Sequence, residues 1–348
     1  MNNFEQEFKG KRILVTGGTG SIGSEIVRQI LKYDPKKIRV FSRSEGKHHD
    51  LMQELGTDDQ RLRYIVGDIR DKERLRMAME DIDIVFHAAA LKHVPICEDN
   101  PFEAIKTNIL GTQNIIDLAR DFDIEKAIII STDKAVEPSS VMGASKLMAE
   151  KLVLASFYYR GDKRTKFSCV RFGNVLGSSN SILPVFKNQI KNNGHVTITD
   201  PEMTRFLMSV QQAAELVLRA STLTKGQEIF VLKMPAVVIR DFAEAVIDLY
   251  APLYNKNKSE IEIKIIGPRR GEKCHEKLLS DHELDRVLET EDMFVLTPHE
   301  EVMGFTYNRE LPPGTSKPEI KNYSSDQSRR LSKEEIIQLI KESDEELS

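Results

Sequence analysis

The sequence is poor in cysteine and has no paired cysteine motif. Its 348 residues include only Cys97, Cys169 and Cys274, which are far apart and odd in number. This excludes a disulfide framework and a CxxC metal pair, and it favours a reducing compartment, the cytoplasm. The eight histidines form no HExxH motif or tight cluster, so we expect no bound metal. The adjacent His48 and His49 are interpreted as surface residues.

Long apolar runs and a surplus of basic residues are also missing. No run of about 18 apolar residues occurs, so we expect no membrane span, and residues 1–12 lack the apolar core of a signal peptide. Lysine and arginine number 50 against 54 aspartates and glutamates, a net charge of −4, which argues against a nucleic-acid partner. The 40% of apolar residues suffice for a large core, and the length predicts two domains or one large one.

Short apolar runs alternate with helical patterns in the first half of the chain. The runs are residues 11–16, 38–43, 62–66, 82–88, 126–131 and 166–171, and longer helices are expected at 101–120 and 143–159. Near-continuous apolar strands are typical of a parallel sheet that is buried on both faces. The alternation therefore predicts an α/β fold, a doubly wound parallel sheet of the Rossmann type, over residues 9–175.

The pattern changes after residue 174, where loops rich in Ser, Asn, Gly and Pro interrupt the alternation. We expect residues 176–305 to form a smaller substrate domain, with a strand near 225–235 that returns to the main sheet. Residues 306–348 are expected to form a polar tail with a short docking helix at 332–342.

A glycine-rich loop follows the first predicted strand. In VTGGTGSIG, Gly17, Gly20 and Gly23 form a GxxGxxG motif between a strand and a helix. Glycines there allow a tight turn and a close approach of the backbone to a pyrophosphate, which the N-terminus of the helix binds. A glycine turn without a ligand is the alternative, but the flanking strand and helix favour a nucleotide site.

The end of the second strand indicates which dinucleotide binds. NAD enzymes place a carboxylate about 20 residues after the glycines, to hold the ribose 2′-hydroxyl. Position 43, 20 residues after Gly23, is instead Arg43, and Lys47 follows, which favours the 2′-phosphate of NADP over NAD. A solvated loop arginine is the alternative. The expected cofactor contacts before residue 91 are Gly17, Thr19, Gly20, Ser21, Ile22, Gly23, Ser42, Arg43, Lys47, Asp68, Ile69, Ala88, Ala89 and Ala90.

Polar residues follow the fifth predicted strand. The strand ends in Ser131-Thr132-Asp133-Lys134, and Met142 and Lys146, four residues apart, share one face of the next helix. Polar groups at the carboxyl edge of a parallel sheet lie where such folds bind ligands. An ordinary surface pair of Asp133 and Lys134 is the alternative.

Several motifs together carry a resemblance to a known family. GGTGSIG and the helix-opening lysine resemble extended short-chain dehydrogenase/reductases. More closely, AALKHVP, NILGT, STDKA, MGASK, RFGNV, TRF and GEKCHE are similar to UDP-N-acetylglucosamine 4,6-dehydratases of bacterial capsule and protein-glycosylation pathways, over about residues 9–300. The resemblance implies a UDP-N-acetylglucosamine substrate, a UDP-4-keto-6-deoxy sugar product and a homo-oligomer, either a dimer or a hexamer.

The resemblance also implies roles for individual residues. Thr132 would bind the sugar 4-hydroxyl, Asp133 would protonate the departing 6-hydroxyl, and Lys134 would remove the C5 proton. Lys146 would hold the nicotinamide ribose. Direct pairing of Asp133 with Lys134 opposes these roles, so burial must outweigh it. The implied substrate contacts are Lys92, Asn108, Arg171, Asn174, Thr204, Arg205, Arg269 and Glu272.

Met142 departs from the wider superfamily, which has the tyrosine of a YxxxK motif there. A thioether cannot accept the 4-hydroxyl proton, so we hypothesise that a water held by Thr132, Asp133 or Lys146 does so. The substitution resembles a subset of the dehydratases. Two alternatives remain, a UDP-sugar 4-epimerase of the same fold and a catalytically silent nucleotide-binding regulator. Whether C5 is inverted also stays open.

Overall fold

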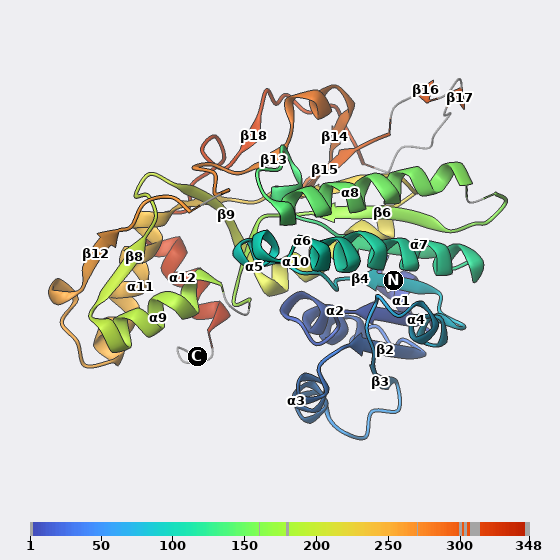
Figure 1. Cartoon of the computed structure of the whole chain (residues 1–348), viewed down its shortest axis with the longest axis horizontal. Helices are drawn as coiled ribbons and strands as arrows, with labels where there is room; N and C mark the ends of the chain where they lie inside the picture. Colours follow the sequence, from blue (N-terminus) through green and yellow to red (C-terminus); the bar gives the residue numbers. More distant parts are fainter. Residues whose placement is uncertain are drawn as a thin grey trace.

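A computed structural model describes residues 3–159, 161–178, 181–269, 271–298, 301–302, 305–306 and 314–344 (Figure 1). Its centre is a nine-stranded sheet in the order β14-β15-β10-β6-β5-β4-β1-β2-β3. Every neighbouring pair from β3 to β10 is parallel, and β15 and β14 are antiparallel additions at one edge. The predicted doubly wound α/β fold is confirmed. The strands are β1 (Arg12–Thr16), β2 (Lys37–Ser42), β3 (Leu62–Val66), β4 (Ile84–His87), β5 (Lys126–Ile130), β6 (Lys166–Arg171), β10 (Ile229–Leu232), β14 (Val287–Glu289) and β15 (Met293–Leu296).

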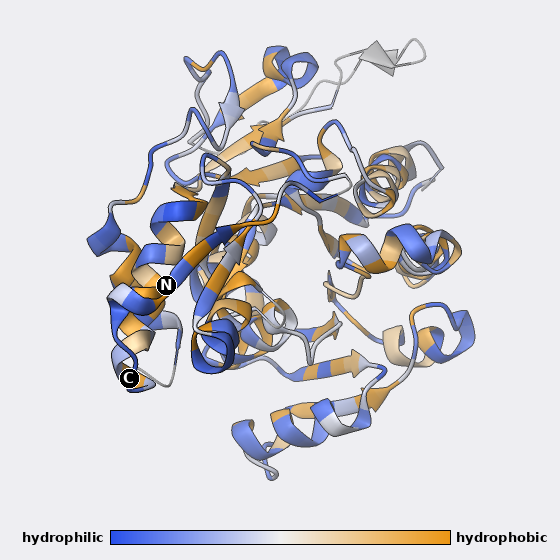
Figure 2. Cartoon of the chain, turned by 60° about the vertical axis from the view of Figure 1, so that its left-hand side comes forward, coloured by the Kyte–Doolittle hydropathy of each residue, from blue (hydrophilic) through white to orange (hydrophobic). Residues whose placement is uncertain are grey.

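Helices form two groups that cover the large sheet. In one group α2 packs on α10, which also contacts α1, and in the other α4, α7 and α8 pack in a row. Because crossovers between parallel strands are almost always right-handed, we expect the two groups to lie on opposite faces of the sheet. Figure 2 shows the apolar strands between helices with hydrophilic outer faces. The bounds are α1 (Asn3–Phe8), α2 (Ser21–Leu31), α3 (Glu45–Leu55), α4 (Lys72–Met79), α7 (Gly111–Asp121), α8 (Val141–Ala155) and α10 (Val210–Leu223).

The predicted helix at 101–120 is divided into three parts. After α5 (Val94–Asp99), the chain forms α6 (Pro101–Ala104), a π-helical turn η1 (Ile105–Leu110) and then α7. The π-helical turn buries Thr107 and Asn108. Such turns are rare and occur often at functional sites, and a hydrophobic pattern does not reveal them. The helix expected at 143–159 ends as α8 at Ala155 and continues as a 3₁₀ turn, η3 (Ser156–Tyr159).

A smaller lobe has its own apolar core, which includes Leu183, Phe186, Phe242, Tyr250 and Ile336. Helix α12 packs on α11 in this lobe, so the tail helix docks here (Figure 1). Every helix in the described part of the chain is too short or too polar to cross a bilayer. The elements are β7 (Asn174–Leu176), α9 (Ile182–Asn193), β8 (His195–Ile198), β9 (Thr204–Ser209), β11 (Ala236–Val238), α11 (Ile239–Leu253), η4 (Lys258–Glu260), β12 (Glu262–Ile265) and α12 (Lys333–Ser343).

The segment after residue 276 does not lie with the smaller lobe, although the sequence assigns it there. Strands β14 and β15 extend the large sheet beyond β10, and β13 (Lys277–Leu279) pairs with β18 (Tyr323–Ser324) of the tail. A 3₁₀ turn, η5 (Asp281–Arg286), lies between β13 and β14. A short hairpin, β16 (Glu301–Val302) with β17 (Phe305–Thr306), follows. The expected boundary at 305–306 falls in this hairpin, whose neighbours 303–304 and 307–313 lie outside the described residues.

Candidate active site

The glycine-rich loop joins β1 to α2 and packs tightly against the main chain at Gly17 and Gly23. Gly17 has φ +66°, and a Cβ there would lie 2.7 Å from the main-chain nitrogen of Ala89. A Cβ on Gly23 would lie 2.3 Å from the carbonyl oxygen of Gly17. Gly20 is the N-cap residue of α2 and has no side chain to compete with an anion for the first N–H groups of the helix. The loop therefore needs its glycines and presents main chain to a ligand.

A cavity of about 420 Å³ opens over this loop at the carboxyl ends of β1, β2, β3 and β4. Its lining includes every residue predicted for the dinucleotide except Lys146, which belongs to the adjoining cavity. The elongated arrangement of glycines, cations and small alanines fits a dinucleotide. The cavity also has lining residues that the sequence did not indicate, namely Phe41, Ser44, Gly67, Leu91, His93, Thr107 and Ser178.

Hydrogen bonds fix the polar groups at the β2 end of this cavity. Ser42 Oγ lies 2.8 Å from Thr19 Oγ1 and 3.0 Å from Nε2 of His48. His48 is therefore not a surface residue: it is 5% exposed, and burial lowers its pKa. Burial alone would raise the pKa of Asp68, but hydrogen bonds from Arg70 hold it below its ordinary value.

Two cations lie at the N-terminus of α3, beside the same cavity. Arg43 and Lys47 both line it, and the Ser44 hydroxyl caps α3 by accepting from the Lys47 main-chain N–H at 3.4 Å. The Arg43 side chain is 58% exposed and lies 3.9 Å from Asp68. An anionic ligand group would find two cations and a helix N-terminus here.

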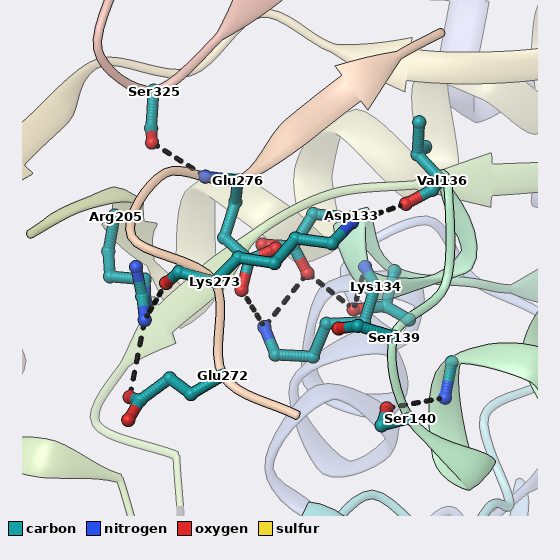
Figure 3. Close-up of polar contacts among 12 residues, drawn as sticks. Asp133, Lys134, Val136, Ser139, Ser140, Arg205, Glu272, Lys273, Glu276 and Ser325 are labelled. Carbon is teal, nitrogen blue, oxygen red and sulfur yellow. Dashed lines mark hydrogen bonds and ion pairs between the residues drawn. The ribbon is translucent and has the colours of Figure 1, made fainter. Parts of the chain in front are cut away.

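The chain after β5 forms a 3₁₀ turn, η2 (Asp133–Ala135), with Thr132 as its N-cap residue. Thr132 Oγ1 donates to Asp133 Oδ1 at 2.8 Å, and Lys134 Nζ donates to the same oxygen at 3.0 Å. Asp133 is fully buried, whereas the Lys134 side chain is 27% exposed. Figure 3 shows Lys134 Nζ between Asp133 and Glu276, whose Oε1 lies 3.6 Å away. The predicted pair is thus a buried charge cluster and not a surface ion pair.

The balance of charges at Lys134 differs from the sequence-based requirement. Burial opposes the ammonium form, but attraction to Asp133 and Glu276 outweighs it and holds the pKa of Lys134 above its ordinary value. The expectation that burial prevails is wrong for this side chain in the structure. Glu276 ends the motif GEKCHE but is not among the predicted site residues, and it causes part of this shift.

Helix α8 presents Met142 and Lys146 to a cavity that Lys134 also lines. Lys146 Nζ donates to the main-chain carbonyl of Ile130 at 2.7 Å, and burial lowers the pKa of Lys146 to about 8. Gly143 allows α8 to pack closely on the turn η2, since a Cβ at this position would lie 2.2 Å from the carbonyl oxygen of Lys134. Thr132, Lys134, Met142 and Lys146 all line one cavity of about 310 Å³, which shares Ala88, Ala90 and Lys92 with the cavity over the glycine loop.

The other side of Lys134 opens towards the smaller lobe. Four of the predicted substrate residues, Asn174, Arg205, Arg269 and Glu272, line a cavity of about 200 Å³ with Lys134 and Glu276. The same four also line an adjoining groove of about 280 Å³ between α9, β9 and α11. Arg205 Nη2 donates to Glu272 Oε1 at 3.2 Å. The structure thus gathers these four residues next to the Asp133–Lys134 pair.

Three other predicted substrate residues are buried and fully occupied by the protein itself. Arg171 is 1% exposed and pairs with Glu150 and Glu283. The side chain of Asn108, also 1% exposed, is bonded to the main chain of residue 91 and to a serine of α8. Thr204 Oγ1 is bonded to His275 and to a serine of the tail. These three expectations are wrong, because the side chains hold the framework and do not line the cavities.

The site and the sheet topology define an α/β protein of the extended short-chain dehydrogenase/reductase class. A family model described as polysaccharide biosynthesis protein matches residues 13–298, and the chain belongs to that family. A Methanocaldococcus jannaschii protein described as an uncharacterised membrane protein is 52% identical over 96% of each chain. A solved structure of Pen from Bacillus thuringiensis matches with a TM-score of 0.87 and 41% identity, over 97% of this chain and 99% of that one.

Other relatives have names that describe an activity. A Campylobacter jejuni protein named UDP-N-acetylglucosamine 4,6-dehydratase (inverting) is 39% identical, over 96% of this chain and 98% of the relative. A Rickettsia rickettsii protein named UDP-glucose 4-epimerase is 38% identical over 96% of each chain. The names of these relatives therefore describe two different activities at nearly the same identity.

Proposed function

We propose that the protein is an NADP-dependent 4,6-dehydratase that converts UDP-N-acetylglucosamine to a UDP-4-keto-6-deoxy sugar for the synthesis of a surface polysaccharide or glycan. The observation that carries the proposal is Lys134, which lines two cavities and forms an ion pair with the fully buried Asp133. One side leads to Lys146 and the glycine loop, and the other leads to Arg205 and Arg269. A substrate that reaches both sides would place its sugar over Lys134, next to the Asp133 carboxyl group that pairs with it.

The cofactor fits the cavity over the glycine loop. The main chain around Gly17 would approach the pyrophosphate, and Arg43 and Lys47 would bind the 2′-phosphate that distinguishes NADP from NAD. Lys146, one turn after Met142, would hold the nicotinamide ribose. The bound nicotinamide would supply a hydride acceptor for C4 and return that hydride to C6.

The residues after β5 would carry out the proton transfers. Oxidation at C4 acidifies the C5 proton, which Lys134 would remove as a base, while Asp133 would protonate the departing 6-hydroxyl. Because Met142 cannot accept a proton, we infer that the 4-hydroxyl proton passes to Asp133 through Thr132 or a water that it holds. The bond from Thr132 Oγ1 to Asp133 Oδ1 supports this route.

The UDP moiety would lie on the side of the smaller lobe. Besides Lys134, the cations that line this cavity are Arg205, Arg269 and Lys273, and arginine binds diphosphate oxygens with a planar fork of donors. The adjoining groove, lined by apolar side chains and by Gln189 and Thr197, would then accept the uridine. In this arrangement Asn174 and Glu272 lie where the diphosphate meets the sugar.

A UDP-sugar 4-epimerase is the second candidate, and the epimerase names of relatives at 38% identity favour it. An epimerase oxidises C4 and returns the hydride to C4. It expels no hydroxyl from C6, so it has no use for an acid next to a base. The buried Asp133–Lys134 pair therefore favours dehydration.

Self-association through the helices beside the crevice also belongs to the proposal. Ile96, Phe102, Leu110 and Met148 on α5, α6, η1 and α8 are between 48% and 72% exposed. Exposed apolar side chains that gather on neighbouring elements are typical of protein interfaces. Light scattering after gel filtration should give the molar mass of a dimer or a hexamer. A Phe102→Glu variant should lower this mass towards that of the monomer.

Mass spectrometry of the product tests the proposed activity directly. We expect the purified protein with NADP⁺ and UDP-N-acetylglucosamine to form a product lighter by one water. A product of unchanged mass with an axial 4-hydroxyl would establish the epimerase instead. Asp133→Asn and Lys134→Ala should each nearly abolish dehydration while NADP⁺ still binds. Arg240→Gln, on the exposed surface of α11, is the matched control and should leave turnover unchanged.

A further inference from the structure

Glu276 is a buried carboxylate for which the proposed mechanism gives no role. It is 3% exposed, directly precedes β13, and lines the cavity that it shares with Lys134 and Arg205. Its main-chain N–H donates to Ser325 Oγ at 3.0 Å, and its carbonyl accepts from the Ser325 N–H at 2.8 Å. Figure 3 shows the first of these bonds and the Glu276 side chain pointing towards Lys134. The tail thus holds this carboxylate at the site.

One ammonium group is shared by two buried carboxylates. Lys134 Nζ lies 3.0 Å from Asp133 Oδ1 and 3.6 Å from Glu276 Oε1. Among the residues that the structure describes, neither Asp133 Oδ2 nor Glu276 Oε2 has a hydrogen-bond partner, and both atoms are buried. A buried carboxylate oxygen without a partner is costly. The cluster therefore has room for one more proton or for a ligand hydroxyl.

The cluster makes it harder for Lys134 to act as a base. A lysine removes a proton only as a neutral amine, and the two carboxylates hold the pKa of Lys134 above its ordinary value although burial opposes this. Burial and the Asp133 carboxylate raise the pKa of Glu276, against the opposing effects of Lys134, Arg205 and Lys273. The proton on Lys134 thus needs an acceptor close by, and the Glu276 carboxylate has a free buried oxygen there.

We propose that Glu276 takes one proton from the Lys134 ammonium group when the substrate fills the cavity, which leaves Lys134 as the neutral base for C5. This inference rests on the dehydratase function proposed above. The transfer turns an ion pair into two neutral groups without a change in net charge. Exclusion of solvent from the cavity by the bound substrate favours this proton transfer, because neutral groups lose less hydration energy on burial than ions. A sugar over Lys134 would cover the 27% of the side chain that is now exposed.

The protons balance over one turnover. Neutral Lys134 takes the C5 proton and becomes an ammonium, and Asp133 gives the departing 6-hydroxyl the proton that it received from the 4-hydroxyl. Water leaves, C6 regains the hydride lost from C4, and Lys134 returns its proton to C5. Glu276 keeps its proton through these steps and gives it back to Lys134 when the product leaves. It touches no sugar atom and acts through Lys134, as a positioning residue.

The pH profile of kcat tests this inference. In the wild type, the resting ion pair and the working neutral pair hold the same number of protons, so kcat should be flat around neutral pH. In Glu276→Gln, Lys134 must lose its proton to solvent. We expect kcat to fall about tenfold or more at neutral pH and to rise about tenfold per pH unit towards alkaline pH. Glu276→Asp retains a carboxyl group and should keep a flat profile at a lower rate.

Two further measurements separate this role from a structural one. In Glu276→Gln, exchange of the C5 hydrogen with solvent deuterium should slow together with kcat, while KM for the nucleotide sugar and reduction of NADP⁺ on mixing stay close to wild type. Asp281→Asn is the matched control, since Asp281 lies on the same segment, is 71% exposed and does not contact Lys134. It should change neither the rate nor the profile.

Each outcome decides the inference. A folded Glu276→Gln variant with the wild-type rate and a flat profile would overturn it. If that variant does not fold, Glu276→Asp decides, because a steeply rising profile there would contradict the proton transfer and a flat one supports it. Failure of the wild type to release water from the nucleotide sugar would instead contradict the proposed function.

Discussion

Arg171 and Glu150 form a buried, bidentate ion pair, with Arg171 Nη2 2.7 Å from Oε2 and Nε 3.1 Å from Oε1 of Glu150. Glu150 lies one turn after Lys146 on α8, and its carboxylate also accepts from Ser131 Oγ at 2.5 Å. Arg171 donates further to the carbonyl of Leu278, two residues beyond Glu276. The pair therefore connects the end of β6 and α8 with Ser131, which follows β5 and precedes the proposed acid and base, and with the segment of Glu276.

Loss of this ion pair should destabilise the protein strongly. Glu150→Gln leaves a buried guanidinium with one carboxylate fewer, which typically costs about 3–5 kcal/mol of the free energy of unfolding. Urea denaturation measures the change. Glu244→Gln breaks the exposed Arg240–Glu244 pair and should cost less than about 0.5 kcal/mol. Equal losses in the two variants would contradict the assigned importance of the buried pair.

The glycine loop should tolerate no side chain at position 17. In Gly17→Ala, the new Cβ would meet the main chain of Ala89 at 2.7 Å, in a backbone conformation with φ +66°. A non-glycine residue in such a conformation costs about 1–3 kcal/mol, and the shifted loop should weaken NADP⁺ binding. Titration with NADP⁺ and urea denaturation measure the two effects.

Gly46→Ala is the control for this prediction. Gly46 is the second residue of α3, and a Cβ there would have nothing within 4 Å. Alanine in a helix should stabilise the protein by about 0.5–1 kcal/mol. Two glycine-to-alanine substitutions should therefore change stability in opposite directions. A destabilised Gly46→Ala variant would contradict the geometry of α3.

The sequence predicted the large sheet well, because its buried strands are continuous apolar runs, and it predicted the glycine loop because only one chain geometry suits that motif. It did not predict which polar residues are exposed. Arg171 and Asn108 have the residue types of ligand contacts, but partners distant in the chain bury and saturate them. His48 is buried for the same reason. Glu276 was missed, since its position between Ser325 and Lys134 depends on the tail folding back.

The proposed preference for NADP over NAD should depend on Arg43. Its guanidinium lines the cavity with Lys47 at the N-terminus of α3, where a 2′-phosphate would make charge-assisted hydrogen bonds. We expect Arg43→Ala to weaken NADP⁺ binding about tenfold or more, which is about 1.4 kcal/mol, and to leave NAD⁺ binding nearly unchanged. Calorimetric titration with both dinucleotides measures the ratio. Equal weakening of both would place the arginine elsewhere than at the 2′-phosphate.

The lowered pKa of Lys146 should appear as a dependence of stability on pH. Burial lowers it to about 8, whereas an unfolded lysine has a pKa of about 10.4. Between these values the unfolded chain binds more protons than the folded one, so wild-type stability should rise with pH in this window. At about 1.4 kcal/mol per unit, the gain from pH 7 to pH 9.5 should be roughly 2 kcal/mol.

Lys146→Met removes this titrating group. The difference in the free energy of unfolding between wild type and variant should therefore change by roughly 2 kcal/mol between pH 7 and pH 9.5. Urea denaturation at each pH measures it, and the comparison cancels the titration of all other groups. Lys341→Met, on the exposed side of α12, is the control and should differ from wild type equally at both pH values. If Lys146→Met also shows a constant difference, Lys146 is charged in the folded protein throughout, and its hydrogen bond to Ile130 must then hold an ammonium group.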